Sequence, residues 1–188
     1  MPSPFSTHTL DNGLTLIFEA IPRIHSAALG FFAKTGSRDE PVAITGISHF
    51  LEHMCFKGTP NRDWRQLSLD VDDLGAMWNA YTWWEGTAYF HWVQAERAND
   101  SIDILADMMR SHLPNEEFDM EKKVILEEIA MYRDRPDALI IDDLIQEAFG
   151  SHPLGQSVLG TEETVGGISR DQMADYFQKR YGPNNLTF

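Results

Sequence analysis

The sequence predicts an α+β fold in which a mixed or antiparallel sheet packs against helices. Strand-like segments dominate the first half of the 188 residues, and helical periodicity dominates the second half. Segregated strands and helices are typical of α+β domains, whereas a regular alternation of the two would predict a parallel sheet. The length, with 43% hydrophobic residues, suits one domain with a sizeable core. We therefore treat residues 1–188 as a single domain.

Two hairpins and two further strands account for the predicted sheet. Residues 9–18 hold Asp-Asn-Gly between short apolar runs, and Asn and Gly tolerate the positive φ of a tight turn. Residues 77–82 and 87–93 are rich in aromatic and β-branched residues and flank a Glu-Gly turn, so they predict paired strands. Residues 26–35 predict another strand. The sequence ends as a last strand begins at residues 185–188, so we expect part of the sheet to be missing or supplied from elsewhere.

The spacing of apolar residues predicts the helices. The expected segments are residues 44–56, 64–74, 95–112, 115–133 and 137–149. Pro114 and Pro136 separate the last three, because proline interrupts a helix interior but is tolerated in a first turn. Ser169, followed three residues later by Gln172, is a capping box and predicts a final helix over residues 170–181.

Composition excludes several classes of function. With 29 acidic and 15 basic residues, the formal charge of −14 disfavours a nucleic-acid partner. The single cysteine, Cys55, excludes an internal disulfide and a cysteine-based metal cluster, so zinc would need histidine and carboxylate ligands. The first residues have neither signal-peptide nor transit-peptide character, and no uncharged apolar run reaches membrane-spanning length. We expect a cytoplasmic protein without a membrane span.

The segment His-Phe-Leu-Glu-His at residues 49–53 carries the main chemical signal. On a helix, successive residues advance by about 100°, so His49, Glu52 and His53 lie within about a third of a turn, and Phe50 and Met54 point to the opposite face. Two imidazoles at i and i+4 can bind one zinc ion, and the carboxylate between them can take a proton from water that zinc has activated. Glu52 would then deliver that proton to the leaving amine of a peptide.

An ordinary solvated helix face is the alternative interpretation of this segment. Ordinary residue frequencies produce the spacing by chance in about one sequence of this length in a few hundred, which favours the metal site. Cys55 lies far from the metal-facing direction by helical angle, so we expect it to pack in the core.

A catalytic zinc site needs a third protein ligand, and the helix over residues 115–133 offers one. Glu121 and Glu128 lie on its apolar stripe with Ile125, whereas Glu127 projects about 100° away. Unpaired carboxylates are costly to bury, so a cation should accompany them. We expect Glu128 to be the third ligand and Glu121 to support the site by a hydrogen bond. The alternative is two boundary glutamates that reach water or pair with a neighbouring basic side chain.

The sequence resembles the inverzincin signature of the pitrilysin (insulinase) family, which includes mitochondrial processing peptidase. Five landmarks occur in the family's order, and together they are far more specific than His-x-x-Glu-His alone. They are residues 49–59, residues 79–82 followed by Thr87 and Tyr89, residues 121–129, residues 160–165 and residues 181–185. The resemblance covers nearly the whole chain and implies an N-terminal pitrilysin-like half-domain.

By this resemblance His49, His53 and Glu128 correspond to the zinc ligands, Glu52 to the general base and Glu121 to the supporting glutamate. Family members bind peptide as an added strand, here near Asn79 and Ala80. Asn79 can instead be a strand-edge residue whose side chain makes a hydrogen bond to a nearby backbone group. The expected activity is that of a zinc endopeptidase acting on short or unfolded peptides. Another divalent metal can also bind such ligands.

The resemblance also implies a partner. Family members enclose substrate between two related halves, so this chain is expected to pair with a second half-domain or an oligomer partner and to be inactive without it. A noncatalytic structural or partner subunit is the alternative function, and its expected sign is loss of a ligand or of the base. All four positions are intact here. The aromatic residues of the paired strands are more numerous than the family leads us to expect, and we assign most of them to core or interface packing.

Overall fold

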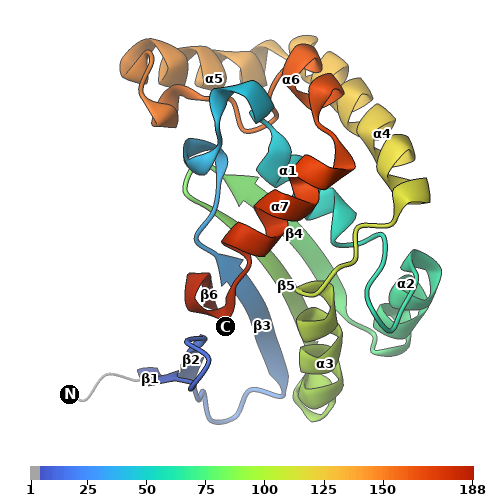
Figure 1. The fold of residues 1–188 in the computed structure, drawn as a ribbon. Helices are drawn as coiled ribbons and strands as arrows, with labels where there is room; N and C mark the ends of the chain where they lie inside the picture. Colours follow the sequence, from blue (N-terminus) through green and yellow to red (C-terminus); the bar gives the residue numbers. More distant parts are fainter. Residues whose placement is uncertain (1–4) are drawn as a thin grey trace.

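The computed structural model describes residues 5–188 and has the predicted sheet and helices (Figure 1). The sheet has six strands in the spatial order β1-β2-β6-β3-β5-β4. Their bounds are β1 Phe5–Thr9, β2 Thr15–Glu19, β3 Ser26–Ala33, β4 Met77–Trp83, β5 Gly86–Gln94 and β6 Leu186–Thr187. β2 and β6 are parallel, and the other neighbouring pairs are antiparallel. The sheet is therefore mixed, and the α+β prediction is confirmed.

Seven α-helices follow or interrupt the strands within the described residues. Their bounds are α1 Ile47–Met54, α2 Trp64–Asp73, α3 Ala98–Met108, α4 Asn115–Arg133, α5 Pro136–Phe149, α6 Glu162–Gly167 and α7 Arg170–Arg180. None of the helices in residues 5–188 has the length and apolar character needed to cross a bilayer.

The core lies between one face of the sheet and the helices (Figure 1). Helix α1 contacts β4 and β5, α3 contacts β3 and β5, and α7 and α4 pack against α1. Phe50, Leu51 and Met54 of α1 are fully buried there, together with Tyr89 of β5. Cys55 is also fully buried, which confirms the packing role expected for it. Because α1 is enclosed on several sides, its orientation is fixed by packing.

Several helix bounds differ from the sequence prediction for local reasons. Gly46 has φ of 95°, a left-handed conformation that glycine adopts without strain, so α1 begins at Ile47 and not at residue 44. Residues Ala95–Arg97 form a 3-10 turn, so α3 begins only at Ala98. Helix α6 was not predicted, because its six residues are too few to show periodicity, although Thr161 caps it.

Candidate metal centre

Helix α1 carries three of the predicted site residues on the side that does not enter the apolar core. Its N-terminus has no side-chain cap from Gly46. The carboxylate of Glu40 takes that role, since its oxygens accept hydrogen bonds from the backbone N–H groups of Gly46 and Ser48, each at 2.7 Å. The hydroxyl of Ser48 also bonds that of Tyr176 at 2.9 Å. These contacts hold the start of α1, and with it His49 one residue later.

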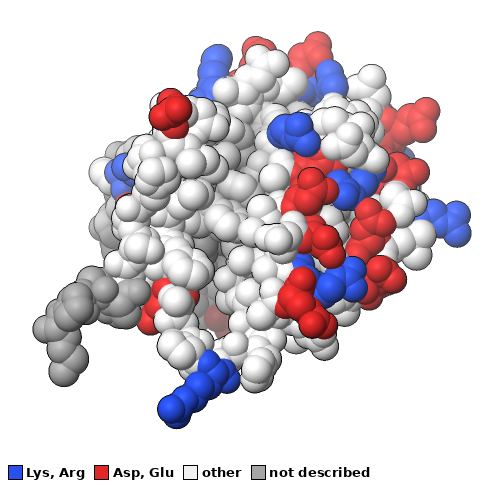
Figure 2. Space-filling view, turned by 90° about the horizontal axis from the view of Figure 1, so that it is seen from below, with Lys and Arg blue, Asp and Glu red and all other residues white. Residues whose placement is uncertain are grey.

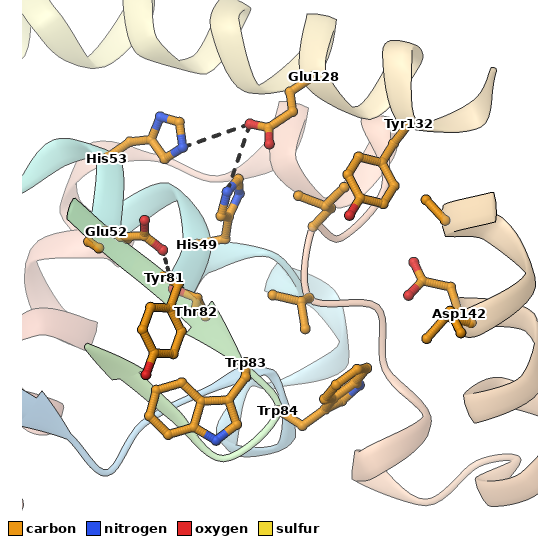
Figure 3. A pocket seen from close by; sticks show the side chains of 15 residues that line it. His49, Glu52, His53, Tyr81, Thr82, Trp83, Trp84, Glu128, Tyr132 and Asp142 are labelled. Atoms are coloured by element: carbon orange, nitrogen blue, oxygen red, sulfur yellow. Dashed lines mark hydrogen bonds and ion pairs between the residues drawn. The ribbon is translucent and has the colours of Figure 1, made fainter. Parts of the chain in front are cut away.

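His49, His53 and Glu128 converge at one point between α1 and α4 (Figure 3). One ligand atom from each lies within 4.8 Å of the others. The Nε2 atoms of His49 and His53 are each 3.8 Å from Oε2 of Glu128. Glu127, the neighbouring carboxylate, is exposed, as its helical angle predicted.

These three residues fit a zinc ion. Separations of 3.8 Å are too long for hydrogen bonds. Ligand atoms of a tetrahedral zinc site at bond lengths near 2.0–2.2 Å lie about 3.4 Å apart, so a small inward movement suffices. Burial lowers the pKa of His49 to about 3, which keeps its imidazole neutral, as a metal ligand must be. Two imidazole nitrogens and one carboxylate are a common donor set of catalytic zinc sites.

Glu121 contacts His53, one of the predicted ligands. Its Oε1 atom lies 2.8 Å from Nδ1 of His53, and its Oε2 atom lies 2.6 Å from Nζ of Lys57. Burial opposes the charge on Glu121, but the bonds to His53 and Lys57 outweigh burial and lower the pKa of this carboxyl. The ionised carboxylate accepts a hydrogen bond from Nδ1–H of His53, which leaves Nε2 of His53 as the atom that can bind a metal.

Glu52 is buried beside the ligands and is oriented by β4. Its Oε2 atom accepts a hydrogen bond of 2.6 Å from the hydroxyl of Thr82. Burial raises the pKa of Glu52, while the Thr82 bond lowers it by stabilising the carboxylate. A raised pKa brings a carboxylate closer to neutral pH, where it exchanges protons effectively. Thr82 was not among the predicted site residues, because a threonine in a strand gives no sequence signal.

A groove of about 470 Å³ opens at this centre. One wall is β4 and the turn after it, and the other comes from α4, α5 and the loop before α6 (Figure 3). The lining residues other than the ligands and the base are Ala80, Tyr81, Thr82, Trp83, Trp84, Tyr132, Ala138, Ile141, Asp142, Val158 and Leu159. Most of the far wall is apolar. The sequence did not predict it, since Val158 and Leu159 come from an irregular loop.

The two predicted substrate-contacting residues take different places. Ala80 lines the groove, and β4 is the edge strand of the sheet, paired within residues 5–188 only with β5. Asn79 does not line the groove. Its side-chain oxygen lies 2.9 Å from the backbone N–H of Ala80, the local backbone bond that was the alternative interpretation of this residue.

Comparison with known proteins agrees with this geometry. The model of the family described as Insulinase (Peptidase family M16) matches residues 15–162, which is most of the chain and includes the four predicted ligand and base residues. This chain belongs to the insulinase family, peptidase family M16.

The M16 relatives are named as zinc proteases. An uncharacterized zinc protease of Bacillus subtilis is 41% identical over 95% of this chain and 44% of its own. One of Rickettsia bellii is 39% identical over 99% of this chain and 45% of its own. The chain thus spans less than half the length of these relatives. These names agree with zinc as the cofactor, and His49, His53 and Glu128 form a group that could hold the ion.

Solved M16 structures have the same half-domain fold. A protease from Helicobacter pylori superposes with a TM-score of 0.93 at 25% identity, covering 97% of this chain and 45% of that one. A peptidase M16 domain from Pseudomonas fluorescens, named as an inactive domain, superposes with a TM-score of 0.88 at 16% identity. The superposition covers 97% of this chain and 45% of that one. An inactive domain shares this fold, so the fold alone does not indicate activity. The site residues determine whether a domain of this fold can be active.

Proposed function

We propose that this chain is the catalytic half of a zinc endopeptidase, with Glu52 as the general base. The observation that supports this most is the convergence of His49, His53 and Glu128 beside a buried, Thr82-bonded Glu52. A zinc ion bound there supplies Lewis-acid chemistry: it polarises a carbonyl group and lowers the pKa of a water molecule. Glu52 accepts a proton from that water and passes it to the leaving amine.

The substrate is an extended peptide in the groove. β4 has a free edge at Ala80, whose backbone N–H bonds the side-chain oxygen of Asn79, and an added peptide strand would replace that bond. Thr82 lies further along the same strand and holds Glu52. One strand therefore aligns both the peptide and the base. Backbone pairing tolerates many sequences, which favours short or unfolded peptides as the substrate class.

The test compares Glu52→Gln with wild type. We would measure zinc content and cleavage of a quenched fluorescent peptide on the 188-residue chain and on a chimera. In the chimera this sequence replaces the matched 180 residues of the Bacillus subtilis relative. Glu127→Gln is the matched control, because Glu127 lies next to Glu128 on α4 but is exposed.

The expected result is that the wild-type chimera cleaves the peptide and that Glu52→Gln keeps its zinc while losing activity by about 10²–10⁴-fold. Glu127→Gln should stay within about twofold of wild type. Equal cleavage by Glu52→Gln would contradict the role of the base. A zinc-loaded wild-type chimera that cleaves nothing would contradict the peptidase assignment and favour a noncatalytic subunit.

A further inference from the structure

Tyr132 is a polar side chain of the far wall of the groove that the proposed hydrolysis does not use. It follows Glu128 by four residues on α4, so the two side chains project from the same side of the helix, about 6 Å apart along its axis. Tyr132 is half-buried and lines the groove. Figure 3 shows its ring beside Glu128, with the hydroxyl directed into the groove. A phenol therefore lies next to the predicted ligand of α4.

The hydroxyl of Tyr132 has no hydrogen-bond partner within residues 5–188. Its ring contacts Arg135, whose guanidinium lies 5.7 Å from the ring centroid and whose side chain also bonds Asp137 at 2.8 Å. By contrast, the hydroxyls of the three buried tyrosines each lie 2.9 Å from another hydroxyl. The unpaired phenol of Tyr132 is therefore available to bond a molecule that enters the groove.

A peptide paired with β4 has a second edge, which faces α4 and the rest of the far wall. Alternate residues of a strand direct their backbone N–H and C=O groups to opposite edges, so every second residue turns a C=O group to that wall. These carbonyls leave water when the peptide enters the groove, and a buried carbonyl without a donor weakens binding. The apolar side chains of the wall offer no donor, and an ionised Asp142 offers only acceptors. The hydroxyl of Tyr132 is a donor in this place.

We propose that Tyr132 is a substrate-binding residue, whose hydroxyl donates a hydrogen bond to a backbone carbonyl on the free edge of the bound peptide. This role rests on the proposed function, in which the peptide pairs with β4 and is cleaved beside Glu128. Tyr132 is about 6 Å further along α4, and an extended chain rises about 3.3 Å per residue, so the carbonyl lies within about two residues of the cleaved bond. The contact is to the peptide backbone, so it adds affinity without selecting side chains.

Peptide affinity, measured without cleavage, tests this role. The proteins are the zinc-loaded Glu52→Gln forms of the 188-residue chain and of the Bacillus subtilis chimera. Each is compared with the same protein carrying Tyr132→Phe, which removes the hydroxyl and keeps the ring that Arg135 contacts. Glu127→Gln is the control, because Glu127 is exposed on α4. Fluorescence anisotropy of a labelled peptide gives the dissociation constant, and thermal unfolding checks the fold of each variant.

The labelled peptide carries no charged side chains. Charged residues gather on the side of α2 and α3 (Figure 2), where acidic groups would hold a cationic peptide away from the groove. A second series of the same peptide has one backbone oxygen at a time replaced by sulfur. A thioamide sulfur accepts a hydrogen bond more weakly than an amide oxygen does, so this series locates the carbonyl that Tyr132 binds.

Tyr132→Phe should raise the dissociation constant by about 3- to 10-fold, as expected for one neutral hydrogen bond, and Glu127→Gln should change it by less than about twofold. One thioamide should weaken binding when Tyr132 is present and have no effect with Tyr132→Phe. Equal dissociation constants with and without the hydroxyl, or an identical thioamide pattern in both, would overturn the proposal. Cleavage does not enter this readout, so a chimera that binds peptide through Tyr132 but hydrolyses nothing would contradict the proposed function alone.

Discussion

On the inner side of the central sheet Phe31 and Tyr89 are buried beneath helices, whereas on the outer side Phe32 and Trp92 remain about half exposed. The two sides are similarly apolar in sequence, so hydrophobicity alone does not distinguish them. What distinguishes them is polar chemistry. Glu52 bonds Thr82 and His53 bonds Glu121 on the inner side, where helices enclose them. The inner side therefore carries the polar groups of the candidate metal centre, whereas the outer side is apolar and partly exposed.

The largest contrast between the two sides should be in stability. Phe50 is fully buried and stacks on Phe118 with ring centroids 4.8 Å apart. Phe50→Ala should lower the free energy of unfolding by about 3–5 kcal/mol, through lost burial and the cavity left behind. Phe32→Ala in the isolated chain should cost under about 1 kcal/mol, because Phe32 is 45% exposed. Urea unfolding measures the free energy of unfolding of both variants. Equal losses in Phe50→Ala and Phe32→Ala would contradict the difference between the two sides of the sheet.

The next effect concerns the ligand supplied by α4. Glu128→Gln removes the charged oxygen donor and should weaken zinc binding by more than about 100-fold, measured by competition with a chelator. Glu127→Gln should leave the zinc affinity unchanged, since Glu127 is exposed. A similar loss in both variants would indicate that general negative charge, and not ligation, holds the ion.

A smaller effect is expected from the residue that supports His53. Glu121→Gln replaces the carboxylate that contacts Nδ1 of His53 and Nζ of Lys57. Loss of such an outer hydrogen bond typically reduces metal affinity by about 10–100-fold, and we expect that range here. Unchanged affinity in the same chelator competition would show that α1 alone orients His53.

A further effect, which depends on pH, should come from Glu40, whose carboxylate caps α1. Burial raises the pKa of Glu40 from 4.5 to about 7, although two backbone N–H groups stabilise its carboxylate. Protonation is therefore easier in the folded chain, so the stability from this group is complete below pH 4.5 and is lost as pH rises through 7. Because the pKa rises from 4.5 to about 7, the change is about 3 kcal/mol.

Urea unfolding between pH 4.5 and pH 8 measures this dependence. Relative to wild type, Glu40→Gln should be less stable overall, because its amide cannot accept both N–H bonds. Its stability should also fall less steeply with pH over this range. Equal slopes in the two proteins would contradict the assignment to Glu40.

The sequence predicted the chemical centre better than its surroundings. Helical angle alone placed His49 and His53 together and separated Glu128 from Glu127, because helix geometry is regular and the neighbours are local. The far wall of the groove was not predictable, since Leu159 is brought there by an irregular loop. The exposure of Phe32 and Trp92 on the outer side of the sheet was equally unpredictable, because strand alternation does not reveal what covers either side.

One zinc ion is expected to bind between α1 and α4 on the inner side of the sheet. Elemental analysis together with zinc-edge X-ray absorption on the purified 188-residue chain measures this. We expect one zinc ion per chain, with two imidazole nitrogens and a carboxylate oxygen among its ligands, and loss of that ion in His49→Ala. A chain that binds no zinc, or that keeps it with the same spectrum in His49→Ala, would contradict this expectation.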